Sequence, residues 1–345
     1  MVSIFVTGAG ALLGQGILRC LNQAKNNYDI VSADTSAKST GHALANRSYL
    51  IPLASDSNYL NAIESILQKE NINIIMVGTD VELPIFSENQ LYLEKKYNLK
   101  IIISPKKVID IANDKFLTAK FLEENNFPFP ISVLTTDKIG MDRLAKSGLY
   151  PYIAKPIDGA RSKGIKIIKN KEELLFETTY NNNLVVQEML DEDHGEFTTG
   201  CIVIDGKCVA TVSLIRDLRD GNTWRAYRTN EVSKYDEIIA SIAEKIGVEG
   251  PVNFQYRIKN GQPVIFEING RFSGTTPLRL MFGFNEVEAL VEYYISGEPI
   301  KMPKLKEGTI LRTFSDIFVE NSVIDSLSIE KYTENFCSTY YPFKN

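Results

Sequence analysis

Two oxygen-bearing side chains stand two positions apart in an apolar strand pattern. Glu267 and Asn269 alternate with Phe266 and Ile268, so a strand would present the first pair on one face and point the second pair into a core. Gln255 can join them from a partner strand. Mg²⁺ prefers oxygen ligands supplied jointly by protein and phosphate. The sequence therefore predicts a magnesium site formed by these three polar side chains.

The turn between the two strands decides whether the three side chains can meet. Asn260-Gly261 is a signal for a two-residue hairpin loop, but that loop would turn Gln255 away from Glu267. A three-residue loop that includes Gln262, or an equivalent bulge, pairs these two residues instead. Pro263 fits this choice because it can donate no ladder hydrogen bond. We therefore predict an odd-length loop.

Cations and glycines that could hold a polyphosphate lie upstream. Lys115 stands at a predicted helix start, and Lys155 ends an apolar strand, where we expect it beside an exposed loop and not packed in the core. Lysines on two elements can clamp a polyphosphate as point charges, and a glycine-rich hairpin offers backbone N–H groups to phosphate oxygens. The hairpin would contribute Gly159, Arg161, Ser162, Lys163 and Gly164.

Two further segments suit the rest of a nucleotide. The end of a strand can present alternating backbone donors and acceptors to an adenine edge, and Glu196 can hold ribose hydroxyls. Arg271 adds a permanent cation beside a phosphoryl group in transfer, where Lys155 would also act. The expected adenine contacts are Glu188, Met189 and Leu190.

In their order along the chain, these motifs resemble those of the ATP-grasp superfamily, nearest its carbamoyl-phosphate-synthase-like carboxylate–amine ligases. The resemblance implies ATP and Mg²⁺ as cofactors, and a ligase that activates a carboxylate as an acyl phosphate for attack by an amine or similar nucleophile. Small-molecule substrates are the implied partners, and the protein could form a homodimer. Gly270 departs from the Asn-Pro-Arg run of many relatives, while Gln255 matches the carbamoyl-phosphate-synthase branch.

A glycine-rich loop near the N-terminus supports an alternative function. The GAGALLG run of residues 8–14 lies between a predicted strand and helix, and Asp34 follows its last glycine by 20 residues, where a ribose-binding acid of an NAD site is expected. An NAD-dependent Rossmann oxidoreductase or epimerase is thus one alternative, and Tyr92 with Lys96 supplies a YxxxK pair. The same glycines can serve helix packing alone. A non-catalytic ATP-binding sensor is the other alternative.

Substrate contacts are expected in two places. In the ATP-grasp family the N-terminal glycine loop more often helps bind substrate than NAD, which would involve Gly8 and Gly10. Residues 216–228 form the best candidate for a substrate-facing loop, because arginines suit bidentate recognition of carboxylates. The four arginines of this segment are Arg216, Arg219, Arg225 and Arg228.

The pattern of strands and helices predicts an α/β region followed by an α+β region. Over residues 1–105 strands alternate with helices, which indicates a parallel sheet in a Rossmann-like domain that precedes the ATP-grasp domain. The resemblance assigns residues 106–298 to a two-subdomain ATP-grasp fold, with a small lid at about 115–187. Residues 299–345 form a C-terminal segment with one predicted strand over 309–319.

Composition excludes several classes of protein. The 38 basic residues are outnumbered by 43 acidic ones, giving a net charge of −5, which argues against nucleic-acid binding. Four scattered cysteines and two histidines support neither a zinc cage nor a Cys/His nucleophile. The sequence contains no apolar stretch long enough to span a membrane. We therefore expect a cytoplasmic protein without a membrane partner.

Overall fold

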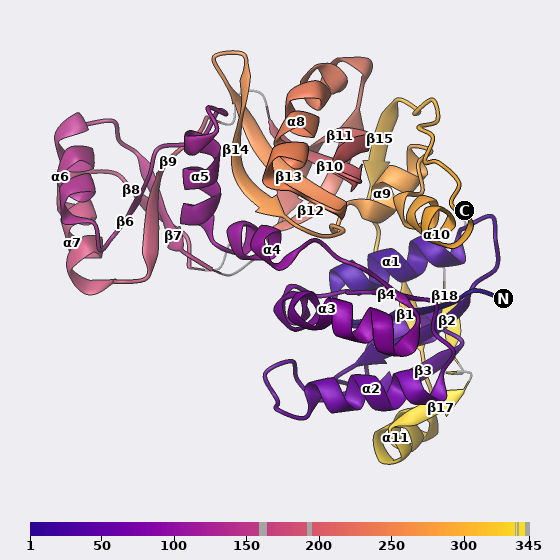
Figure 1. Ribbon diagram of the computed structural model, residues 1–345. Helices are drawn as coiled ribbons and strands as arrows, with labels where there is room; N and C mark the ends of the chain where they lie inside the picture. Colours follow the sequence, from indigo (N-terminus) through magenta and orange to yellow (C-terminus); the bar gives the residue numbers. More distant parts are fainter. Residues whose placement is uncertain (159–163, 192–194, 335, 337, 342–345) are drawn as a thin grey trace.

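The computed structural model describes residues 1–158, 164–191, 195–334, 336 and 338–341. Two six-stranded sheets and a small four-stranded sheet make up most of the structure, and a further two-stranded pair lies near the C-terminus. In Figure 1 the small sheet stands at one end, the second large sheet occupies the middle, and the sheet of the N-terminal strands lies at the other end.

The N-terminal sheet has the strand order β17-β3-β2-β1-β4-β5, and its five N-terminal strands are parallel. Helices lie on both faces, because alternate strand residues pack in opposite directions: Ile4 and Val6 pack toward α1, whereas Phe5 packs toward α2 and α3. The α/β prediction is therefore confirmed. Its helices are α1 (Leu12–Asn22), α2 (Tyr59–Lys69) and α3 (Leu83–Tyr97). Its parallel strands are β1 (Ser3–Val6), β2 (Asp29–Asp34), β3 (Arg47–Leu50), β4 (Ile74–Met76) and β5 (Lys100–Ile102).

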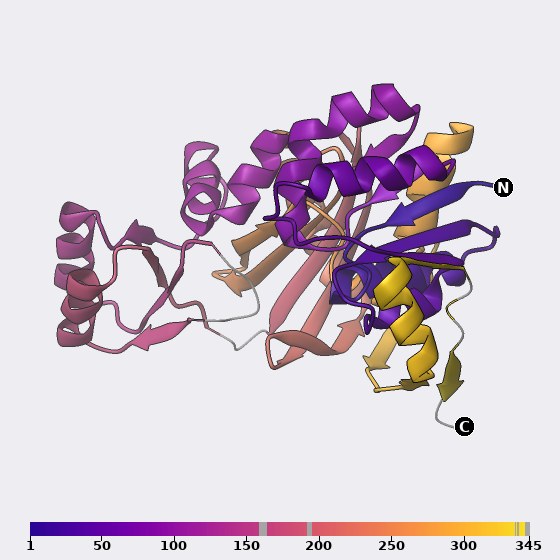
Figure 2. The ribbon, with the colours of Figure 1, turned by 90° about the horizontal axis from the view of Figure 1, so that it is seen from below.

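Two helices connect this sheet to the small one. Helix α4 (Lys106–Asn113) leads into α5 (Lys115–Glu124), and Asp114 caps α5 by accepting hydrogen bonds from the backbone N–H groups of the helix's first turn. The small sheet has the order β6-β9-β7-β8 with antiparallel neighbours. Figure 2 shows it standing apart from the rest of the protein. It contains β6 (Ser132–Leu134), β7 (Tyr152–Pro156), β8 (Lys166–Ile168) and β9 (Leu184–Glu188), with helices α6 (Lys138–Ser147) and α7 (Lys171–Tyr180).

The large antiparallel sheet has the order β14-β13-β10-β11-β12-β15. Helix α8 (Asp236–Ile246) packs on one face, while α9 (Thr276–Met281), α10 (Glu286–Ser296) and α1 pack on the other. The predicted α+β texture is confirmed. Its strands are β10 (Glu196–Ile204), β11 (Lys207–Arg219), β12 (Asn222–Arg228), β13 (Gly250–Lys259), β14 (Gln262–Asn269) and β15 (Gly308–Leu311). Short 3₁₀ turns lie at η1 (Thr40–Leu44), η2 (Asp80–Glu82) and η3 (Asn230–Tyr235).

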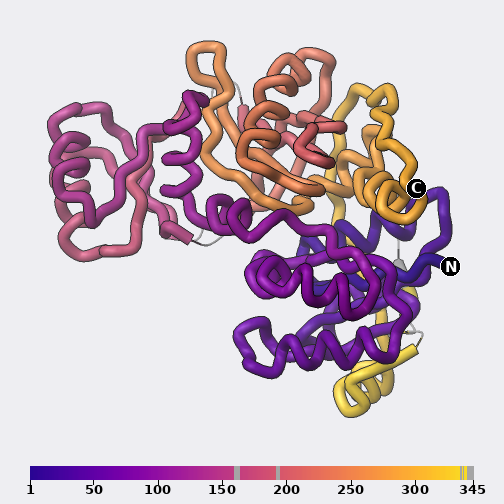
Figure 3. Tube along the Cα trace, in the orientation of Figure 1, coloured from indigo at the N-terminus to yellow at the C-terminus, as the bar shows by residue number. Residues whose placement is uncertain are grey.

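The C-terminal segment returns to both large sheets, as the tube in Figure 3 shows. The prediction of one strand over 309–319 is wrong. β15 ends at Leu311, and the next residue, Arg312, still bonds its backbone N–H to Trp224 while its side chain bonds to Gly274. β16 (Asp316–Phe318) then pairs with β18 (Thr339–Tyr341), and after α11 (Asn321–Glu330) strand β17 (Tyr332–Glu334) pairs antiparallel with β3. Among the described residues, no helix is long and apolar enough to cross a membrane.

Candidate active site

The hairpin β13–β14 closes with a shorter loop than predicted. Lys259 pairs with Gln262, so only Asn260 and Gly261 form the loop. Both loop residues have positive φ, at 52° and 75°, which matches the two-residue turn that the twist of a hairpin favours. The predicted odd-length loop is therefore wrong, because this turn chemistry is satisfied without a third residue.

A β-bulge restores the pairing that the loop does not provide. The register shifts between Gln255 and Tyr256, so that Phe266 is the extra residue and Gln255 lies opposite Glu267. The equivalent bulge that the sequence allowed is thus present. Phe266 was expected in the core, but as the bulged residue it lines a cleft, with the Lys155 ammonium 5.6 Å from its ring centroid. Ile268 is buried as expected.

The three predicted magnesium ligands lie together on one face of the hairpin. Glu267 Oε1 accepts hydrogen bonds from Gln255 Nε2 and Asn269 Nδ2, each at 3.0 Å. The amide oxygens face cations, because Gln255 Oε1 accepts from Arg216 at 2.7 Å and Asn269 Oδ1 accepts from Arg271 at 2.8 Å. Carboxylate and amide oxygens are suitable ligands for a divalent ion that also takes phosphate oxygens, but both amide oxygens would have to turn from their arginine partners toward the ion.

The charge of this group also matters for a metal. It contains one carboxylate, and in the part of the chain that the structure describes there is no group of three or more His, Cys, Asp or Glu residues that could hold a metal ion. A Mg²⁺ ion held by Gln255, Glu267 and Asn269 would therefore need phosphate oxygens to complete its shell. The group fits a metal that arrives with a polyphosphate.

The cleft beside these residues has a volume of about 320 Å³ and lies between the small sheet and the large one. That is within the range of small-molecule sites, ~300–1,000 Å³. Most of the predicted nucleotide contacts line it, on both sides. The predicted residues in its wall are Lys115, Lys155, Glu188, Met189, Leu190, Glu196, Arg216, Gln255 and Glu267.

The two predicted phosphate lysines both enter the cleft. Lys155 is only 6% exposed, so the expectation that it would not be packed is wrong: β7 carries it against Phe266 and beneath the cleft. Burial lowers the pKa of Lys155 to about 8, with Glu267 opposing the shift. Burial also lowers the pKa of Lys115, against the attraction of Glu267 and Asp158. Two desolvated ammonium groups beside one carboxylate favour a polyanionic ligand.

The far end of the cleft contains the predicted adenine and ribose contacts. Glu196 accepts from Arg216 Nη2 at 2.6 Å and from Arg257 Nη2 at 3.2 Å, and Glu188 accepts from Lys259. Arg257 also donates to the Leu190 carbonyl at 2.8 Å. The sequence analysis missed Arg257, although it stands two residues after Gln255 on the same strand and so points to the same face.

The four-arginine segment is a β-hairpin, so the prediction of a single loop is wrong. Alternate strand residues point to opposite faces, which separates its arginines. Arg216 lies in the cleft, Arg219 stacks over Trp224 at 4.9 Å, and Arg225 forms an exposed ion pair with Asp217 at 3.5 Å. The fourth, Arg228, is buried at the end of β12.

Arg271 lies next to the predicted magnesium ligands but outside the cleft wall. Its Nε and Nη2 atoms contact the Asp80 carboxylate at 2.5 and 3.0 Å, while Nη2 also reaches Asn269. Asp80 follows β4 at the carboxyl end of the N-terminal parallel sheet. The ion pair thus joins the N-terminal sheet to the strand that carries Glu267.

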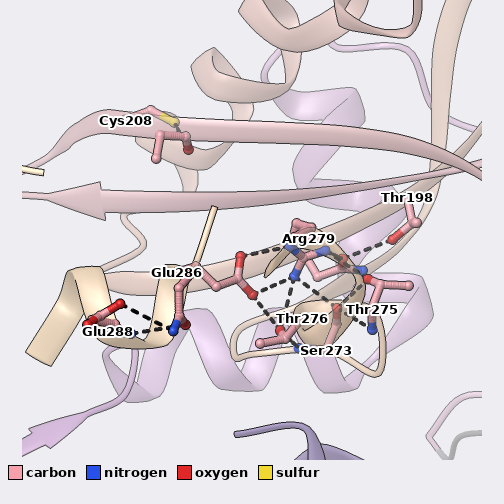
Figure 4. A network of polar contacts seen from close by, with 11 residues as sticks. Thr198, Cys208, Ser273, Thr275, Thr276, Arg279, Glu286 and Glu288 are labelled. Carbon is pink, nitrogen blue, oxygen red and sulfur yellow. Dashed lines mark hydrogen bonds and ion pairs between the residues drawn. The ribbon is translucent and has the colours of Figure 1, made fainter. Parts of the chain in front are cut away.

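The loop after Arg271 is held by a buried ionic network (Figure 4). Arg279 and Glu286, both at most 2% exposed, form an ion pair of 2.7 Å. Arg279 also donates to the hydroxyls of Ser273, Thr275 and Thr276 at 3.1, 2.8 and 3.2 Å. Every hydroxyl of this loop therefore has a defined partner, and the loop is rigidly positioned between β14 and α9.

Arg312 contacts the same loop and was missed by the sequence analysis. It donates to the Gly274 carbonyl, and no carboxylate pairs with it among the described residues. Burial lowers the pKa of Arg312 to about 10, and the neighbouring Arg19 adds to the shift. No local motif marks this residue, because it lies more than forty positions after Arg271 and approaches only through the fold.

The N-terminal glycine loop makes hydrogen bonds and close contacts with neighbouring residues of its own domain. The N–H of Gly10 donates to Asp34 Oδ2 at 2.7 Å, and Asp34 Oδ1 accepts from the Ser39 hydroxyl at 2.5 Å. Gly8 has a φ of 54°, and a Cβ at Gly14 would lie 2.2 Å from the Gly8 carbonyl. The glycines thus allow α1 to pack closely against the loop. Asp34, the acid that would bind an NAD ribose, already accepts hydrogen bonds from Gly10 and Ser39.

Two other sequence features can now be placed. Tyr92 and Lys96 bond to each other and to Glu64 on the exposed surface of α3, away from every cleft residue. Of the predicted glycine-rich hairpin, Gly164 is described and has a φ of 74°. Four predicted phosphate contacts lie outside the described residues: Gly159, Arg161, Ser162 and Lys163.

Comparison with known proteins identifies relatives of this architecture. Residues 112–275 match the ATP-grasp domain family, and residues 4–102 match the PylC-like N-terminal domain family. The chain is 25% identical over 308 residues to the carbamoyl phosphate synthase large chain of Thermoplasma acidophilum. This alignment covers 80% of the chain but 28% of that protein's length.

Solved structures share the fold at low identity. The biotin carboxylase domain of Hydrogenobacter thermophilus 2-oxoglutarate carboxylase, in complex with MgADP, ADP and bicarbonate, matches with a TM-score of 0.69 and 18% identity, over 89% of this chain and 73% of that one. An ADP complex of N5-carboxyaminoimidazole ribonucleotide synthetase matches with a TM-score of 0.71 and 14% identity, over 95% and 84%. The chain therefore carries an ATP-grasp domain over residues 112–275, and the carbamoyl phosphate synthase large chain is among its relatives.

Proposed function

We propose that this protein is an ATP- and Mg²⁺-dependent ligase that activates a small-molecule carboxylate as an acyl phosphate and transfers the acyl group to an amine or similar nucleophile. The observation that carries the proposal is the convergence of Lys115, Lys155 and Glu267 on one cleft. One buried and one half-buried ammonium group, beside a carboxylate flanked by amides, suit a metal-bound triphosphate better than a nicotinamide cofactor. The ADP and MgADP complexes of the structural neighbours agree with this assignment.

The nucleotide would lie along the cleft with its adenine at Glu188–Leu190 and its ribose at Glu196. Its phosphates would then reach Lys115 and Lys155. Glu196 now binds Arg216 and Arg257, so ribose hydroxyls would share this carboxylate with two guanidinium groups. When ATP binds, Glu196 would therefore exchange some of its hydrogen bonds to Arg216 and Arg257 for bonds to ribose, while each charged group keeps a charged neighbour.

Mg²⁺ would be held by Gln255, Glu267 and Asn269, where it would neutralise charge on the phosphates. The protein's own contribution to phosphoryl transfer is position and charge. Lys155 would contact the transferring group from the buried side of the cleft. Arg271, fixed by Asp80, would supply a permanent positive charge next to Asn269.

The carboxylate substrate would bind near the loop after Arg271. Arg312 has no carboxylate partner among the described residues, and it contacts the Gly274 carbonyl on that loop. Because Gly274 packs against Leu12 of α1, the N-terminal glycine loop, with Gly8 and Gly10, lies on the same side. A guanidinium with no local counter-ion is suited to a substrate carboxylate.

The domain division that accompanies this proposal follows the sheets. Residues 1–105 would form the N-terminal domain, 106–298 the ATP-grasp domain with its lid at about 115–187, and 299–345 the C-terminal segment. That last segment contributes β15 to the large sheet and β17 to the N-terminal sheet. It would therefore tie the two domains together.

A phosphate-release screen tests the proposed activity. The protein is incubated with ATP, Mg²⁺ and pools of amino acids or other small carboxylates, and inorganic phosphate is measured. Release that depends on one pool, and is lost in Lys155→Ala, supports a ligase. Tight ATP binding without turnover on any pool indicates a nucleotide sensor instead.

A binding comparison separates this proposal from the oxidoreductase alternative. Thermal unfolding is measured with Mg-ATP and with NAD or NADH in parallel. Stabilisation by Mg-ATP alone is the expected outcome, since a ligand that binds only the folded state raises its stability. Stabilisation by the nicotinamide cofactor alone would overturn the proposal.

A further inference from the structure

A second cavity opens at the edge of the large sheet and shares no residue with the nucleotide cleft. Its volume is about 420 Å³, and its wall comes from β11, the end of β12, the start of α8 and the segment after α10. Strand β12 pairs with β11 only from Ile215 to Arg219. The earlier part of β11, Cys208–Thr211, therefore borders the cavity along an edge that β12 does not cover.

Arg228 is the charged group that the cavity leaves unsatisfied. Its side chain is 7% exposed, and its Nε and Nη1 atoms are buried with no hydrogen-bond partner among the described residues. Buried guanidinium nitrogens without partners are unfavourable, so such atoms in native proteins are normally hydrogen-bonded. The arrangement indicates that a ligand oxygen completes it.

Asp236 supplies the opposite charge in the same cavity. Asp236 stands at the start of α8, and its carboxylate accepts a hydrogen bond from the Ser213 hydroxyl on β11. Burial raises the pKa of Asp236 to about 6, while the charge of Arg228 lowers it. No ion pair joins these two described residues, and the cavity thus presents separate positive and negative groups.

The charges and the wall define the chemical class of the ligand. A phosphate dianion would meet the Asp236 carboxylate, and a simple carboxylate would leave that carboxylate without a cationic partner. A zwitterion satisfies both groups and keeps the net charge of the site unchanged. Val209, Met302 and Leu305 add an apolar wall for a side chain.

We infer that this cavity binds a free α-amino acid, with its carboxylate on the Arg228 guanidinium and its ammonium group on the Asp236 side. The site is separate from the proposed ligase reaction, which uses neither residue. The protein would therefore bind an amino acid at this second cavity, independently of the substrate that enters the nucleotide cleft.

Calorimetric titration of the full chain without nucleotide tests this inference. The probes are individual L-amino acids, with acetate and inorganic phosphate as single-charge comparisons. At least one amino acid should bind about tenfold more tightly than acetate, the ratio expected for one added charge-assisted contact. Arg228→Met should abolish this binding, whereas Arg225→Gln, a change at an exposed arginine on the same strand, should not alter it.

The Asp236→Asn variant tests the ammonium contact of the ligand separately from its carboxylate contact. This variant should weaken amino-acid binding while leaving acetate binding unchanged, because only the ammonium contact is lost. The inference is overturned if no amino acid binds, if Arg228→Met binds as well as the wild type, or if phosphate binds as tightly as the best amino acid. Retained binding in Arg228→Met would place the amino acid in another site, such as the substrate site of the proposed ligase.

Discussion

The Arg271 guanidinium and the Asp80 carboxylate form a double ion pair across 191 sequence positions, with contacts of 2.5 and 3.0 Å. The pair connects the end of a parallel strand in the N-terminal sheet with the strand that carries the proposed metal ligands. Arg271 also donates to Asn269. The N-terminal sheet therefore contributes directly to the position of a cation in the proposed active site.

We predict that Asp80→Asn lowers turnover by about tenfold, the scale expected when a residue that orients an active-site group is replaced. The KM for ATP should change little, because Asp80 lies outside the nucleotide cleft. Steady-state kinetics measure both parameters. Glu231→Gln, a change at an exposed glutamate, is the matched control. Unchanged turnover in Asp80→Asn would show that the position of Arg271 does not depend on this pair.

Glu267→Gln should reduce Mg²⁺-dependent activity on the order of 100-fold. The change keeps the shape of the side chain but removes the only carboxylate among Gln255, Glu267 and Asn269. Activity is measured across a magnesium titration, with Glu298→Gln as an exposed control. A variant that reaches wild-type activity at the same magnesium concentration would remove these residues from the metal site.

Lys155→Ala should abolish most turnover and weaken ATP binding while the far-ultraviolet circular dichroism stays unchanged. Lys155 is buried, and its pKa of about 8 shows that the surroundings disfavour its charge without a ligand. Its removal should therefore not destabilise the nucleotide-free protein. Lys115→Ala should have the same effect more weakly, because Lys115 is less buried. Loss of secondary structure in Lys155→Ala would make the lysine structural.

Glu82 should make the folding stability depend on pH. Burial raises its pKa from 4.5 to about 7, so the folded state binds more protons than the unfolded state between these values. Stability from this group is therefore present below about pH 4.5 and is lost as the pH rises to about 7, by on the order of 3 kcal/mol. Glu82→Gln should flatten this dependence in urea unfolding curves. Equal pH dependence in the two proteins would rule out Glu82 as its source.

The order of motifs along the chain predicted much of the cleft, since Lys115, Lys155 and Glu267 lie in its wall. Their convergence was predictable because each stands at the end or on one face of a recognisable strand or helix. Either a three-residue loop or a bulge could place Gln255 opposite Glu267, and the bulge at Phe266 was only one of these two alternatives. Sequence could not choose between them, because turn chemistry and strand register are independent until side chains pack.

The residues that sequence did not place are those whose role depends on distant contacts. Strand β3 has a mixed apolar and polar sequence and was not predicted, since its pairing with β2 and β17 decides its conformation. Arg228 and Arg312 carry no local motif, and their partners, or lack of them, follow from the packing of whole elements. Only the three-dimensional structure separates these arginines from the exposed ones.

Transfer of oxygen from the carboxylate to phosphate tests the proposed reaction most directly. The carboxylate found by the phosphate-release screen is labelled with heavy oxygen in both carboxyl positions, and the product phosphate is analysed by mass spectrometry. Formation of an acyl phosphate and its displacement by the nucleophile places one labelled oxygen in each phosphate released. Unlabelled phosphate would show that water attacks ATP, and would contradict the ligase mechanism.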